Sequence, residues 1–240
     1  MIPVNINRIR ERIQRAATKA GRRPEDVKLL LATKTVTAEG IREAAKYGEL
    51  LMGENKVQEL KQKHEALHDL PLNKHFIGHL QSNKVKDVLQ YVSCIESLDR
   101  HSLAIALQKK LSQSDSHIDV MIQVNTSFEA SKFGLKPDDA LTFAASLKNY
   151  DRLRIKGFMT IGLFDADPEK VRPSFALLRQ IKEEAIAHKI LSPEEAFHLS
   201  MGMSNDLETA IEEGATIVRV GTAIFGKRAL PDSYYWNEKA

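Results

Sequence analysis

The chain has 240 residues, 42% of them hydrophobic, and no apolar stretch approaches the length of a membrane span. Its 35 Lys and Arg residues and 32 acidic residues are spread along the sequence, whereas a nucleic-acid-binding face would concentrate its cations. The single cysteine, Cys94, excludes an intrachain disulfide and a zinc site built from several thiolates. Residues 1–20 also lack the apolar core of a secretory signal. We therefore expect one cytoplasmic domain over residues 1–240, with no membrane or nucleic-acid partner.

Short apolar segments rich in β-branched residues recur along the chain and predict strands. They cover residues 27–34, 50–55, 74–80, 91–98, 118–125, 153–162, 195–202 and 216–226. The polar segments between them, such as AEGIREAAKYG and NDLETAIEEG, carry apolar residues at helical spacing. Strands that alternate with helices in this way predict a parallel sheet covered by helices.

The number of these units favours a closed sheet over an open one. Eight strand–helix units within about 250 residues are typical of the (β/α)8 or TIM barrel, and this is the fold we predict. Residues 3–20 form an additional N-terminal helix, which we expect to fill the outer ring where the barrel closes, together with the short tail at 227–240. An open doubly wound sheet is the alternative, but no G-x-G-x-x-G motif follows the first strand.

Active sites of such barrels lie at the carboxyl ends of the strands, where the first predicted strand ends on Lys34. The strand period of two places Leu30 and Ala32 on the inner face with Lys34, and it turns Thr33 towards the helices. An ammonium group partly stripped of water there has a lowered pKa and forms Schiff bases. From position alone, an ordinary solvated lysine remains the alternative.

The last two predicted strands end in small and hydroxyl residues. HLSMGMSND brings Ser200 and Ser204 to the end of the seventh strand, and VRVGTAIFG brings Gly221 and Thr222 to the end of the eighth. The loops at these places are the usual phosphate site of the barrel, and a glycine lets an anion approach the main chain. Plain turn and helix-cap residues are the alternative interpretation.

In a closed barrel the eighth strand lies beside the first, so an amine and a phosphate site share one pocket. Pyridoxal 5'-phosphate (PLP) needs both, because its aldehyde condenses with a lysine while its phosphate anchors the other end. Arg219 lies two residues before Gly221 on the same inner face, where it would meet the pyridine nitrogen. A guanidinium there disfavours a protonated ring, so carbanion chemistry would be weakly supported.

Several motifs together resemble one known family. They are LLATKT, GENKVQEL, HFIGHLQSNK, SKFG, GFMTIG and LSMGMSNDLETAIEEGATIVRVGTAIFG. Over residues 27–227 the chain resembles the pyridoxal phosphate homeostasis proteins, also called the YggS or PROSC family. The resemblance implies an alanine racemase-like barrel that binds PLP through Lys34 and supplies it to PLP-accepting apoenzymes, without a firmly assigned reaction. It further implies that Ser200, Gly221 and Thr222 contact the phosphate, that Arg219 meets the ring nitrogen and that Asn55 lies near the cofactor.

Weaker candidates complete the predicted site. His79 is a candidate ligand contact at the end of the third strand, and Met201 either lines the cofactor site or fills the core. His75 and Cys94 are expected to be a packed histidine and an inert core thiol. No metal site is predicted, because the pair His64 and His68 lacks a third ligand.

Two enzymatic alternatives use the same lysine. A PLP-dependent amino-acid racemase needs a second base opposite Lys34, and the chain's late tyrosines, Tyr234 and Tyr235, lie in the tail. A Schiff-base aldolase needs a nearby proton-transfer group, for which Glu54 is a candidate, although a first-turn helix acid is the favoured interpretation of Glu54. We therefore expect a monomeric carrier of PLP without robust catalytic activity.

Overall fold

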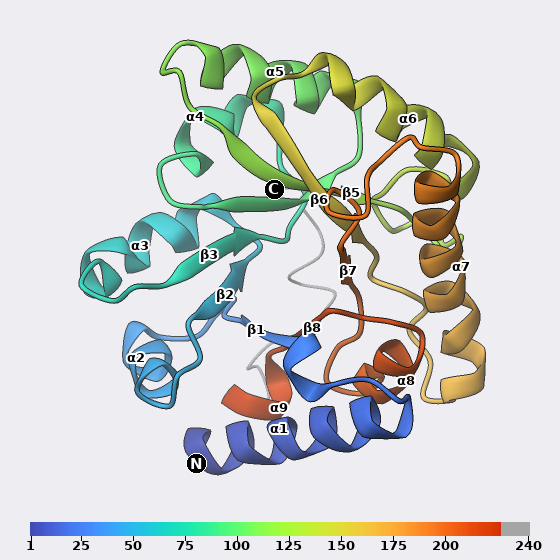
Figure 1. Cartoon of the computed structure of the whole chain (residues 1–240). Helices are drawn as coiled ribbons and strands as arrows, with labels where there is room; N and C mark the ends of the chain where they lie inside the picture. Colours follow the sequence, from blue (N-terminus) through green and yellow to red (C-terminus); the bar gives the residue numbers. More distant parts are fainter. Residues whose placement is uncertain (227–240) are drawn as a thin grey trace.

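The computed structural model describes residues 1–226 and contains a closed barrel of parallel strands that neighbour one another in chain order (Figure 1). The strands are β1 (Lys28–Ala32), β2 (Leu51–Glu54), β3 (Asn73–Phe76), β4 (Cys94–Leu98), β5 (Ile118–Gln123), β6 (Leu153–Met159), β7 (His198–Ser200) and β8 (Ile217–Val220). The pairing of β8 with β1 closes the barrel, so the predicted fold is confirmed and the open doubly wound sheet is excluded.

Helices surround the barrel and follow the strands in alternation (Figure 1). They are α1 (Ile2–Lys19), α2 (Ala38–Lys46), α3 (Val57–Leu67), α4 (Val85–Val88), α5 (His101–Ser112), α6 (Ala140–Ser146), α7 (Pro168–Ala187), α8 (Leu207–Glu212) and α9 (Thr222–Phe225). Their buried apolar residues form one large outer core with the outward side chains of the strands. Within residues 1–226, no helix has both the length and the apolar character needed to cross a membrane.

The strands alternate between two cores, as their sequence period predicts. Leu30 belongs to a small inner cluster with Cys94, Met121, Met159 and Ile217, while its neighbours in β1 pack in the outer core. Cys94 is buried in this cluster, and burial raises the pKa of its thiol well above the ordinary value. The thiolate is therefore disfavoured, as expected for an inert core residue.

The additional helix α1 covers the place where the barrel closes. It contacts α2, α8 and α9, and its buried residues Ile6, Ile9 and Ile13 face the outer core. Asn5 also donates a hydrogen bond of 2.9 Å to the carbonyl oxygen of Ile224 in α9. The predicted role of the leading helix is thus confirmed, whereas the predicted contribution of residues 227–240, Tyr234 and Tyr235 included, lies outside the described residues.

The strands end earlier than the sequence pattern predicted. Lys34, Asn55 and His79 lie in the loops that follow β1, β2 and β3. The predicted strand ends lie too far along the chain because the apolar pattern continues beyond the last paired residue. The prediction of one strand over 216–226 was wrong in its second half, since β8 ends at Val220 and α9 follows. Gly221 makes this change of direction with φ −120° and ψ −75°, a ψ that leaves the extended conformation of a strand.

Candidate functional site

Lys34 and Gly221 lie at the carboxyl ends of two neighbouring strands. In the pairing of β1 with β8, Leu30 lies opposite Arg219 and Leu31 opposite Val220. Gly221 follows Val220 directly, and Lys34 follows Leu31 by three residues. The expectation that the first and last strands bring an amine and a glycine turn to one end of the barrel is therefore confirmed.

Lys34 is a buried lysine, since only 8% of its surface is exposed. It occupies a tight turn in which the next residue, Thr35, has φ 65°. The preceding residue, Thr33, is fully buried and directs its hydroxyl outside the barrel, where it donates a hydrogen bond of 2.7 Å to Oε1 of Glu54. Thr33 thus faces the helices, as its place in the strand period predicts.

A small polar cradle follows β7 and β8. Gly221 is the N-cap of α9. The hydroxyl of Thr222, the first residue of that helix, donates a hydrogen bond to Oγ of Ser204 at 3.3 Å. The same oxygen of Ser204 accepts from the amide of Ala223 at 3.4 Å. Ser204, Gly221 and Thr222 therefore gather hydroxyl and amide groups in one place, a type of arrangement that binds anions.

Ser200 lies elsewhere, inside the barrel beside Arg219. The guanidinium of Arg219 donates to Oγ of Ser200 at 3.0 Å and to the carbonyl oxygen of Thr160 at 2.7 Å. Ser200 in turn donates to Oε2 of Glu96 at 2.6 Å, and Nδ1 of His75 lies 2.6 Å from Oε1 of the same carboxylate. The structure therefore places Ser200 in a buried network that holds Arg219 on the inner face of the barrel.

Opposite charges hold this network together. Burial alone would raise the pKa of Glu96, yet the hydrogen bonds and charges of His75, Arg219 and Ser200 keep that pKa below its ordinary value. Burial likewise lowers the pKa of Arg219, while the carboxylates of Glu96 and Asp206 oppose the shift. Glu96 was missed in the sequence, although an acid within the apolar strand YVSCIESL is a signal for a buried charge with a partner.

The remaining candidates fall in different places. Asn55 lies against Gly78, where an added Cβ would come within 2.1 Å of the Asn55 carbonyl oxygen. His79 stacks on Phe133 with ring centroids 3.8 Å apart, and its Nδ1 lies 3.7 Å from a carboxylate oxygen of Asp99. Met201 is fully buried in the outer core, so the structure does not bring its side chain to the strand ends beside Lys34.

Glu54 is not the first-turn helix acid that the sequence favoured. It is the last residue of β2, three residues before α3 begins, and its carboxylate lies beneath α3, bonded to Lys63 at 2.6 Å. Burial raises its pKa to about 7, the charge of Lys63 opposes that shift, and Glu59 adds to it. Because Glu54 faces the helices together with Thr33, the aldolase alternative loses its candidate for proton transfer inside the barrel.

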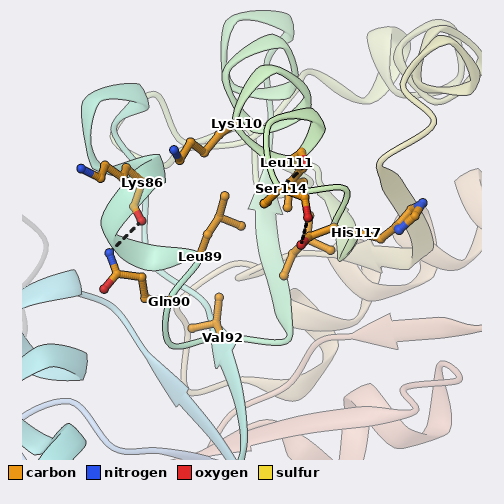
Figure 2. Close-up of a pocket in the computed structure, with 10 residues that line it drawn as sticks. Lys86, Leu89, Gln90, Val92, Lys110, Leu111, Ser114 and His117 are labelled. Atoms are coloured by element: carbon orange, nitrogen blue, oxygen red, sulfur yellow. Dashed lines mark hydrogen bonds between the residues drawn. The ribbon is translucent and has the colours of Figure 1, made fainter.

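One cavity lies at the other end of the barrel. It has a volume of about 410 Å³ and is lined by residues that precede β4 and β5, such as Val92 and His117, and by Lys86 and Lys110 of α4 and α5 (Figure 2). The amino ends of these strands point away from Lys34, so this cavity is separate from the candidate site. Within the part of the chain that the structure describes, no group of three or more His, Cys, Asp or Glu side chains could hold a metal ion.

The fold and the buried lysine define the class of the protein, a barrel of the alanine racemase type. The family model "Alanine racemase, N-terminal domain" matches residues 4–229. A solved alanine racemase of Clostridium difficile shares the fold at a TM-score of 0.72 and 13% identity, covering 96% of this chain and 60% of the racemase.

More similar proteins define the family within that class. The "Pyridoxal phosphate homeostasis protein" of Aquifex aeolicus is 45% identical over 224 residues, which is 93% of this chain and 96% of the relative. PipY of Synechococcus elongatus, solved with PLP bound, is 32% identical at a TM-score of 0.78, covering 90% of this chain and all of PipY. The chain belongs to the family of pyridoxal phosphate homeostasis proteins.

Proposed function

We propose that the protein binds PLP and acts in its homeostasis, holding the cofactor as a Schiff base on Lys34. The pairing of β1 with β8 supports the proposal, because it brings a buried lysine and a cluster of hydroxyl and amide groups to the same end of neighbouring strands. The PLP-bound structure of PipY, a relative at 32% identity, supports the same ligand.

The described residues fit the chemistry of PLP at both of its ends. PLP supplies an aldehyde that condenses with a primary amine and releases water. Lys34 provides the amine, and the amide and hydroxyl groups around Gly221, Thr222 and Ser204 provide donors for a phosphate. Ser204, which the sequence already placed in this loop, is included among the proposed phosphate contacts because its hydroxyl is hydrogen-bonded to that of Thr222.

Arg219 is proposed to face the ring nitrogen, and Ser200 to act through Arg219. The guanidinium is fixed by Ser200 and Thr160 on the inner face, two residues before Gly221. A permanent cation at the ring nitrogen disfavours protonation of that nitrogen and weakens the ring as an electron sink. This favours reversible storage over strong carbanion catalysis.

Asn55 and His79 are proposed to line the cofactor site from the loops after β2 and β3. Both follow the carboxyl ends of their strands, the end at which Lys34 also lies. We further propose that the protein works as a cytoplasmic monomer that passes PLP to accepting apoenzymes. A covalent bond that forms and hydrolyses without further chemistry suits such a donor.

Absorbance titration with PLP tests the proposal. The unchanged protein and a Lys28→Ala variant, which removes an exposed lysine from the amino end of the same strand, are expected to develop the absorption band of an imine. A Lys34→Ala variant should develop no such band, although its phosphate cradle can still retain free PLP. An equal band in the Lys34→Ala protein would refute the assignment of Lys34.

A further inference from the structure

Three ionisable side chains hold the Lys34 turn from outside the barrel. Lys63 of α3 donates to the carbonyl oxygen of Thr33 at 2.8 Å, to Oε1 of Glu54 at 2.6 Å and to Oε2 of Glu59 at 2.7 Å. All three side chains are largely buried, with exposed fractions of 12% for Lys63, 0% for Glu54 and 17% for Glu59. Ion pairs shielded from water in this way are less screened by salt than pairs on the surface.

The turn itself is strained. Thr35 has φ 65°, a left-handed conformation that is a genuine outlier for a β-branched residue. Such a conformation is energetically unfavourable and persists only where its surroundings determine it. Here the amide of Thr35 donates to Oε2 of Glu59 at 2.7 Å, so a carboxylate fixes the strained residue.

Both residues that flank Lys34 are therefore bonded to the same helix. Lys63 holds the carbonyl oxygen before Lys34, Glu59 holds the amide after it, and the two side chains pair with each other one helical turn apart. Glu54 completes the arrangement, because its Oε1 accepts from both Lys63 and the hydroxyl of Thr33. The main chain on either side of Lys34 has little freedom to move relative to α3.

We propose that Lys63 and Glu59 are positioning residues for Lys34, which fix its turn so that the amine meets the PLP aldehyde in a reactive orientation. The proposal rests on the proposed function of Lys34 and adds two residues of α3 that act on its turn from outside the barrel. Holding a reacting group in place lowers the barrier, and a displacement of about 1 Å can cost up to about 100-fold in rate. Neither Lys63 nor Glu59 lies among the candidate ligand contacts.

A Lys63→Met variant tests the proposal, with Lys61→Met as its matched control. Lys61 is an exposed lysine of the same helix, so the control loses the same charge without touching the turn. Two quantities are measured: the rate of imine formation with PLP, and hydrogen exchange of the peptide covering residues 33–36 in protein without PLP. For Lys63→Met we expect imine formation slower by about 10-fold to 100-fold and faster exchange at residues 33–36.

Two further variants keep the test decisive. Glu59→Ala removes the acceptor of the Thr35 amide but leaves Lys63 paired with Glu54, so it provides folded protein for the same measurements if Lys63→Met unfolds. Lys63→Arg restores a cation with several donors and should recover part of the lost rate. The positioning role is overturned if Lys63→Met and Glu59→Ala both form the imine as fast as Lys61→Met does and also exchange hydrogen at residues 33–36 at the same rate as Lys61→Met. Absence of an imine in the unchanged protein would instead refute the proposed function of Lys34, and the inference with it.

Discussion

At the scale of single residues, Glu96 joins three polar groups inside the barrel. It is fully buried, and its two oxygens bond to His75 and Ser200 while the charge of Arg219 lies near. A buried carboxylate of this kind stabilises the folded state only together with its partners. Removing one charge from such a group leaves the other charges uncompensated.

We therefore expect Glu96→Gln to lower the free energy of unfolding by about 3 kcal/mol, because the buried guanidinium of Arg219 loses its counter-ion. Urea denaturation at neutral pH measures the change. Glu65→Gln, which alters an exposed acid of α3, is the control and should stay within about 0.5 kcal/mol of the unchanged protein. An equally small effect of Glu96→Gln would show that the network contributes little to stability.

The raised pKa of Glu54 predicts that the free energy of unfolding depends on pH. Its folded pKa is about 7, raised from 4.5 by burial, so between these values the folded state binds a proton that the unfolded state releases. Stability from this group is thus present below pH 4.5 and is lost as the pH rises to 7. The shift corresponds to a loss on the order of 3 kcal/mol.

Glu54→Gln should remove this dependence, since glutamine keeps an acceptor for Lys63 and Thr33 but does not titrate. Measured by urea denaturation, the stability of the variant relative to the unchanged protein should rise as the pH is raised from 4.5 to 7. A difference between the two proteins that stays constant over this range would contradict the raised pKa.

Sequence patterns identified the residues whose position follows from their own strand. Lys34, Arg219 and Gly221 were predicted from strand ends and the period of two, and the structure puts them at the β1–β8 junction. Ser200 was assigned to the phosphate, but the structure directs its hydroxyl to Glu96, a residue of a different strand. Glu96 and Lys63 could not be assigned roles from the sequence, because their partners lie on other elements whose register and orientation are set by packing.

At the scale of elements, α1 is the main addition to the repeating strand–helix pattern. Its position beside α8 and α9 covers the junction of β1 and β8, and Ile9 is 1% exposed at the centre of its buried face. Helix existence was predictable from the spacing of apolar residues, whereas helix and strand ends were not. Apolar side chains continue past the last paired residue, so strands read from hydrophobicity alone are too long.

Ile9→Ala is expected to destabilise the protein by about 2–5 kcal/mol, because it leaves a cavity between α1 and the outer core. Val4→Ala provides the comparison on the same helix, since Val4 is 64% exposed and its truncation should change stability by no more than about 0.5 kcal/mol. Thermal or urea unfolding followed by circular dichroism measures both. Equal stabilities of the two variants would contradict a stabilising role for the buried face of α1.

At the scale of the whole molecule, closure of the barrel makes the site possible. Residues 34 and 221 are far apart in the chain, and only the pairing of the first strand with the last makes them neighbours. The number of strand–helix units predicted this closure from the sequence. The detailed contacts of the site depend instead on loops, whose geometry follows from particular hydrogen bonds such as those around Thr35 and Ser204.

Trapping the bond between the protein and PLP shows directly whether Lys34 carries the cofactor. Protein incubated with PLP is reduced with borohydride, which converts an imine into a stable amine, and is then digested and analysed by mass spectrometry. If Lys34 holds PLP as proposed, the pyridoxyl phosphate label is found on the peptide containing Lys34. A label found on other lysines only, or no label on protein that binds PLP, would refute a Schiff base on Lys34.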